Sequence, residues 1–132
     1  MFLQNVPQKY KKLFMDLAYT MMGIDGKYED EEKLALRSCQ EELGLTQYRG
    51  STIDLDDANL LLVQDRTLRA EMYFELLGIA LSDSEYSEEE LGAMKKIQKA
   101  WEIPTEFDKT AQEIIRNINR NYARACILLS QF

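Results

Sequence analysis

The chain has 132 residues, of which 45% are hydrophobic and 30% charged, and this composition predicts one globular domain rather than a disordered segment. Its net charge of −7 opposes binding to nucleic acid and to anionic membrane surfaces. Histidine is absent, which removes the commonest general base and the commonest transition-metal ligand.

Two amphipathic helices are predicted in the first third of the chain. Apolar residues recur at three- and four-residue steps over about residues 7–24, which is typical of a helix with one buried face. Gly26 is expected to supply the left-handed cap that ends this helix. A second helix is predicted from Glu29 or Asp30 to Leu43, because its acidic first turn suits the positive end of the helix dipole and Gly44 follows it.

The middle of the chain predicts a looser connection and then two further helices. Residues 45–53 contain Gly50 and Ser51 and have no clear periodicity. A short third helix is expected next, capped by Asp54 or Asp56 and carrying the apolar residues 60–63. A fourth helix is predicted over about residues 66–81, because apolar side chains again recur on one face.

The last third of the chain predicts two helices with clear boundaries. The segment Ser87 to Glu90 has the pattern of a capping box that opens a fifth helix, and this helix is expected to end near Trp101. A final helix is predicted over about residues 108–131. Its apolar stripe consists of Ile114, Ile115, Ile118, Tyr122, Ala125, Cys126 and Leu129.

The chain also overlays itself when it is shifted by 58 residues, which places Asp25 on Asp83 and Glu32 on Glu90. We therefore predict a single all-α domain over residues 1–132, a compact bundle of about six to seven helices. It would contain two pseudo-twofold-related helix–turn–helix repeats. These repeats and the last helix are expected over about residues 7–45, 66–103 and 108–131.

The two turns carry a family resemblance. Residues 21–32 (MMGIDGKYEDEE) and 80–90 (ALSDSEYSEEE) each combine an apolar helix end, an Asp-containing turn and an acidic first turn with a Glu seven residues after the Asp. This pattern resembles the TerB-like domains, named for a tellurite-resistance protein, over about residues 13–103. One departure is Ser84, which stands where the family's second turn has glycine.

The resemblance implies an all-helical bundle and a role in tellurite resistance or another stress response. TerB-like domains are linked to chemical stress, phage inhibition and co-chaperone-like membrane-stress modules. The resemblance also implies a proposed metal-cation site built on acidic residues.

Spacing places four carboxylates at the inward corners of the two turns. Glu32 lies four residues before Leu36 and Glu90 four before Met94, so each heads the apolar line of its helix. Asp25 and Asp83 extend the apolar stripes of the preceding helices. The candidate metal ligands are Asp25, Glu32, Asp83 and Glu90.

Three interpretations of these carboxylates are open. They could cap free backbone N–H groups, as in a capping box or an Asx turn. They could bind a divalent cation, Ca²⁺ or Mg²⁺, through oxygen ligands shared between the two units. A catalytic acid–base pair is the third reading, but no nucleophile or histidine accompanies the carboxylates. The sequence therefore predicts a non-enzymatic domain.

The last helix carries a candidate partner-binding strip. Arg116, Arg120 and Arg124 lie four residues apart on the face opposite the apolar stripe. They could form a solvated face that pairs with the acidic remainder of the chain, or they could dock an acidic protein partner or a second copy of this chain. A nucleic-acid partner is not expected, because the strip lacks interleaved aromatic residues.

The cysteines and the chain ends bear on location. Cys39 and Cys126 are far apart, form no metal-binding pair and lie on apolar stripes, so both are expected to be buried in a reducing compartment. The first residues have no apolar stretch typical of a signal peptide. No run approaches the roughly 20 apolar residues that a transmembrane segment needs. A cytoplasmic location is the resulting prediction.

Overall fold

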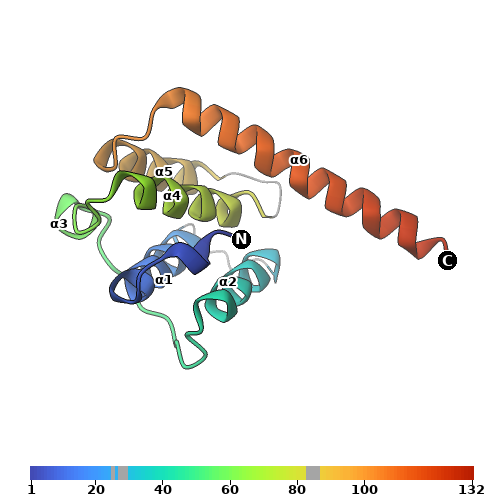
Figure 1. Cartoon of the computed structure of the whole chain (residues 1–132), viewed down its shortest axis with the longest axis horizontal. Coiled ribbons are helices and arrows are strands. Elements are labelled where there is room, and N and C mark those ends of the chain that lie inside the picture. The colour runs from blue at the N-terminus through green and yellow to red at the C-terminus, as the bar shows by residue number, and fades with distance from the viewer. Residues whose placement is uncertain (25, 27–29, 83–86) are drawn as a thin grey trace.

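The computed structural model describes residues 1–24, 26, 30–82 and 87–132. Within these ranges every regular element is a helix, as Figure 1 shows, and this confirms the all-α prediction. The elements are η1 (Leu3–Asn5), α1 (Gln8–Met22), α2 (Asp30–Leu43), α3 (Asp57–Leu60), α4 (Arg66–Ala80), α5 (Glu88–Ala100) and α6 (Thr105–Ser130).

Side-chain caps fix the starts of α3, α4 and α5, and the cap of α5, Ser87, is described with the site below. Asp56 accepts a hydrogen bond from the backbone N–H of Asn59 at 3.1 Å, which identifies Asp56 rather than Asp54 as the cap of α3. Asp65 accepts one from the N–H of Leu68 at 2.8 Å and so opens α4. These bonds satisfy N–H groups that have no partner inside the helix.

The body of the molecule consists of two packed helix pairs. α1 packs against α2, and α4 packs against α5, while α1 and α4 join the pairs (Figure 1). The core between them is made of fully buried apolar side chains, among them Phe14, Met21, Met72, Leu76 and Ile97. α4 contacts α1, α2, α5 and α6, so it is the central helix of the bundle.

The helix pairs recur at a constant interval. α1 begins at residue 8 and α4 at residue 66, while α2 begins at residue 30 and α5 at residue 88, so both intervals are 58 residues. This spacing equals the shift at which the sequence overlays itself. The origin of the two pairs by duplication stays a hypothesis.

Some predicted boundaries are wrong. α1 ends at Met22 and is capped by Gly23, so Gly26 lies beyond the cap although its φ of +74° is left-handed as predicted. α3 ends at Leu60, before the last of its predicted apolar residues. α6 begins at Thr105, directly after Pro104, which is its N-cap. Proline fits this position because the first turn of a helix needs no backbone N–H.

The C-terminal half of α6 departs most from expectation. Only Ala111 and Ile115 are buried in this helix, and every residue after Ile115 is exposed. Figure 1 shows that α6 packs on the body along its first half and then extends past it. Cys126 is therefore exposed, and the prediction that it is buried is wrong. Among the helices of the described ranges, none has the length and apolarity needed to cross a membrane.

Candidate functional site

Two glutamates occupy matching positions at the starts of α2 and α5. Glu32 and Glu90 are each the third residue of their helix, and they are 1% and 2% exposed. Their neighbours Glu31 and Glu89 are exposed. The predicted inward direction of Glu32 and Glu90 is thus confirmed, and both carboxylates are buried in a largely apolar core.

The surroundings of Glu90 follow from the start of α5. The Ser87 hydroxyl oxygen accepts a hydrogen bond from the backbone N–H of Glu90 at 3.1 Å. The same hydroxyl donates to Glu90 Oε1 at 3.0 Å. Ser87 thus caps the helix, as predicted, and also supports one oxygen of the buried carboxylate.

The other two predicted ligands, Asp25 and Asp83, lie outside the described residues. Within the described ranges, no three Asp, Glu or Cys side chains are grouped so that they could hold a metal ion. In this part of the chain no Cα atom of α2 lies within 8 Å of a Cα atom of α5. In the described structure Glu32 and Glu90 therefore occupy equivalent positions, but no third candidate ligand lies close enough to complete a metal site with them. Their carboxylate oxygens are of the type that Ca²⁺ and Mg²⁺ prefer.

A third buried carboxylate, which was not predicted, belongs to a hydrogen-bonded cluster between α1 and the connection after α2. Asp16 of α1 is 3% exposed and is held from two sides. The Tyr48 hydroxyl donates to Asp16 Oδ1 at 2.7 Å, and Lys12 Nζ donates to Asp16 Oδ2 at 2.6 Å. Burial, and then the hydrogen bond to Asp16, raise the pKa of Tyr48 above its ordinary value. The cluster fixes the connection after α2 onto α1.

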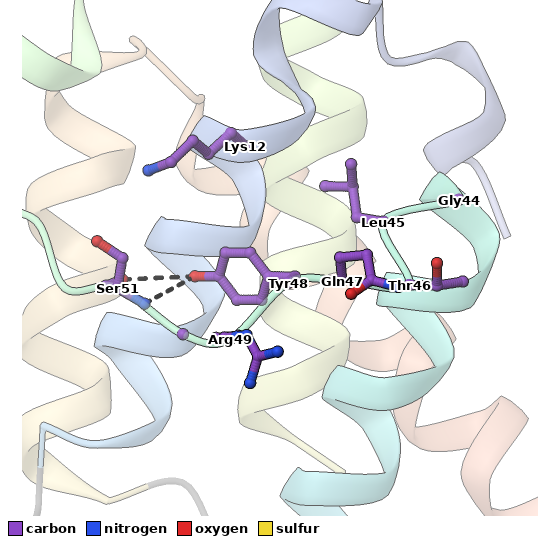
Figure 2. A pocket seen from close by; sticks show the side chains of 9 residues that line it. Lys12, Gly44, Leu45, Thr46, Gln47, Tyr48, Arg49 and Ser51 are labelled. Atoms are coloured by element: carbon purple, nitrogen blue, oxygen red, sulfur yellow. Dashed lines mark hydrogen bonds between the residues drawn. The ribbon is translucent and has the colours of Figure 1, made fainter.

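Figure 2 shows the depression beside this cluster, in which the Tyr48 hydroxyl faces Ser51. The Ser51 N–H donates to the Tyr48 oxygen at 3.1 Å. Lys12 and residues 44–51 line the depression, which has a volume of about 550 Å³. The bonds from Tyr48 and Lys12 explain why Asp16 is buried, because they hold the connection after α2 against α1. Asp16 could have been suspected from sequence as a lone charge inside the apolar run of α1, four residues after Lys12.

The predicted arginine strip is solvent-exposed. Arg116 donates to the side chain of Gln112 at 3.1 Å, and Arg124 donates to that of Asn121 at 3.4 Å. In the described part of the chain none of the three arginines forms an ion pair, so the expected pairing with the acidic remainder is not seen there. Arg116 and Arg120 also line a hollow of about 500 Å³ with Leu81 and Ser82 at the end of α4.

The two cysteines are expected to react differently. Cys39 is 7% exposed, and its pKa is raised to about 12, first by burial and then by the nearby Glu75 carboxylate. Only the thiolate is nucleophilic, so native protein at pH 8 should be alkylated at exposed Cys126 and not at Cys39. Mass spectrometry after iodoacetamide treatment measures this, with urea-unfolded protein as the control that labels both. Equal labelling of both thiols in the native protein would contradict the burial of Cys39.

No family model, curated protein or solved structure matches this chain. The resemblance to TerB-like domains therefore rests on the residues of the two turns alone.

Proposed function

We propose that this chain is a non-enzymatic, TerB-like stress-response domain of the tellurite-resistance-associated type, and that it binds a divalent cation through its acidic turns. Glu32 and Glu90 would be the buried ligands, with Asp25 and Asp83 completing the set. The burial of two charged side chains at equivalent helix positions carries the proposal. Ca²⁺ and Mg²⁺ are the ions proposed.

The energetic argument concerns the cost of burying charge. An ionised carboxylate that leaves water loses far more free energy of hydration than a neutral polar group does, so it needs charge or hydrogen bonds around it. Burying two such groups is costly against a total stability of about 5–15 kcal/mol, and hydrogen bonds such as the one that Ser87 donates to Glu90 offset part of the cost. A cation near the turns would offset that cost. The free domain would then be less stable than the cation-bound domain.

The alternative function is a protein-interaction scaffold whose acidic turns are purely structural. The hydrogen bonds between Ser87 and Glu90 favour it, because they are of the kind that caps a helix without any ion. Under this alternative, binding would use the exposed helix α6 and its arginines. A protein partner would be recognised there, and the turns would only hold α2 and α5 in place.

Cation titration separates the two functions. We expect Ca²⁺ or Mg²⁺ to give a saturable heat in calorimetry and to raise the melting temperature of the domain. At a free cation concentration 100 times the dissociation constant, stabilisation would be about 2.7 kcal/mol, or roughly 10 °C for a domain of this size. The double variant Glu32→Gln/Glu90→Gln should lose both effects.

The matched control is Glu31→Gln/Glu89→Gln, which removes the same charge from exposed neighbours and should retain the cation response. Zn²⁺ serves as a test of selectivity, since the proposed ligands contain no nitrogen or sulfur. Silence for every cation, or equal responses from both double variants, would remove the cation claim. A Glu32→Gln/Glu90→Gln variant that only melts earlier would then favour the structural role.

A further inference from the structure

α6 carries a coiled-coil type seam of which the body covers only the first part. Apolar residues alternate at four- and three-residue steps along it, the spacing by which paired helices interlock. We call these residues the α6 seam: Ala111, Ile115, Ile118, Tyr122, Ala125 and Leu129.

The body of the same chain packs against α6 only up to about the middle of the helix. Asn119 donates a side-chain hydrogen bond to the backbone oxygen of Leu81 at 3.2 Å, which ties α6 to the end of α4. Beyond this point Figure 1 shows the helix extending away from the body. Ile118, Tyr122 and Leu129 are 41%, 73% and 71% exposed. Contiguous exposed apolar faces of this kind typically mark a contact with another surface.

We propose that a second copy of this chain covers the α6 seam, with the two α6 helices packed antiparallel. The positions beside the seam decide which helical partners are tolerated. None of them is charged in this chain: they are Gln112, Ile114, Asn119, Asn121, Cys126 and Leu128. The three arginines lie on the opposite face. Two copies therefore meet without placing like charges across the seam.

The sizes of the seam residues select the antiparallel orientation. In that orientation Tyr122 packs opposite the partner's Ala125, and Ile118 packs opposite the partner's Leu129. A large side chain thus faces a small one, and the interface fills evenly. A parallel pair would place tyrosine against tyrosine and alanine against alanine, which combines overpacking with a cavity. Antiparallel helix dipoles also attract rather than repel.

The exposed area predicts a weak pair. Large apolar side chains on the outer half of α6 expose on the order of 500 Å² per copy, or about 1,000 Å² in the pair, the lower limit for a specific interface. We expect a dissociation constant on the order of 100 µM. Pairing would then depend on local concentration.

The test is sedimentation equilibrium of the full chain from low micromolar to millimolar concentration. The decisive variant is Leu129→Asp, and the matched control is Ile127→Asp. Ile127 is 62% exposed, close to the 71% of Leu129, but it lies on the arginine face. We expect Leu129→Asp to weaken association at least tenfold and Ile127→Asp to associate like the original chain. Both residues lie outside the packed body, so circular dichroism should show folded protein in both cases.

Orientation is tested by a nitroxide at Ser130→Cys in a Cys126→Ser background. In the antiparallel pair the two labels are separated by about 20 Å along the helix axis in addition to the distance between helices. A single shorter distance, as in a parallel pair, would overturn the antiparallel arrangement.

Two further results would overturn the proposal. One is a monomer at every concentration, and the other is equal loss of association in both aspartate variants, which indicates nonspecific hydrophobic contact. If the chain is a monomer at every concentration, its cosedimentation with phosphatidylglycerol vesicles is measured next. Vesicle binding without self-association would assign the seam to a membrane surface.

Discussion

Replacing Trp101 by alanine is expected to destabilise the fold by about 3–5 kcal/mol, the largest effect of any single change discussed for this chain. Trp101 is 1% exposed at the end of α5, and its indole Nε1–H donates to the backbone oxygen of Leu60 at 2.7 Å. The variant loses the packing of the largest core side chain and leaves the Leu60 carbonyl without this donor. Each effect is costly in a buried site.

Urea denaturation followed by circular dichroism measures this change. In thermal denaturation, at roughly 3–5 °C per kcal/mol for a domain of this size, the melting temperature should fall by about 10–25 °C. Trp101→Phe is the control, because it retains one buried aromatic ring and loses the hydrogen bond and part of the packing, at an expected cost of about 2 kcal/mol. A loss below about 1 kcal/mol in the alanine variant would show that α5 does not depend on this anchor.

Replacing Asp16 by alanine is expected to cost about 2–4 kcal/mol. The substitution removes the acceptor of the Tyr48 hydroxyl and of the Lys12 ammonium group, both of which bond to Asp16 at 2.7 Å or less. Hydrogen bonds to a buried charged group contribute more than neutral ones, and the half-buried Tyr48 hydroxyl would lose its acceptor at Asp16. Chemical denaturation at pH 7 measures the change in the free energy of unfolding.

Tyr48→Phe measures what the tyrosine hydroxyl alone contributes to the stability of this cluster. It keeps the ring and removes the hydroxyl, so it should cost about 1–2 kcal/mol. The double variant Asp16→Ala/Tyr48→Phe should cost less than the two single changes added together, because they remove the same bond. Strict additivity would show that Asp16 acts through Lys12 alone. Lys12 is mostly exposed, and its ion pair alone is expected to contribute little.

The helices of the body could be predicted because their signals are local. α1, α2, α4 and α5 follow a clear apolar period, and their ends coincide with caps or glycines. The start of α6 is harder to predict, because Pro104 also stands where a proline typically follows the end of a helix, here α5. Proline also suits the start of a helix, and here it has that role.

The burial of Glu32 and Glu90 could be predicted from their spacing to the apolar line. The Asp16–Tyr48 contact could not, because Tyr48 lies 32 residues away in a connection that has no periodic pattern. The exposure of the outer half of α6 was also missed. Amphipathic spacing predicts that a helix face is apolar, but it does not say whether the same chain covers that face.

The shape of α6 has a consequence for how its free end stays helical. The helix contains no glycine or proline over its 26 residues, so its hydrogen-bond ladder is continuous from the body to Ser130. A detached peptide of about 11 residues, the length beyond Asn119, would be marginal as a helix in water because nucleation is costly. The packed first half supplies that nucleus. The tip is therefore ordered by propagation, and fraying should increase steadily from Asn119 towards the C-terminal end.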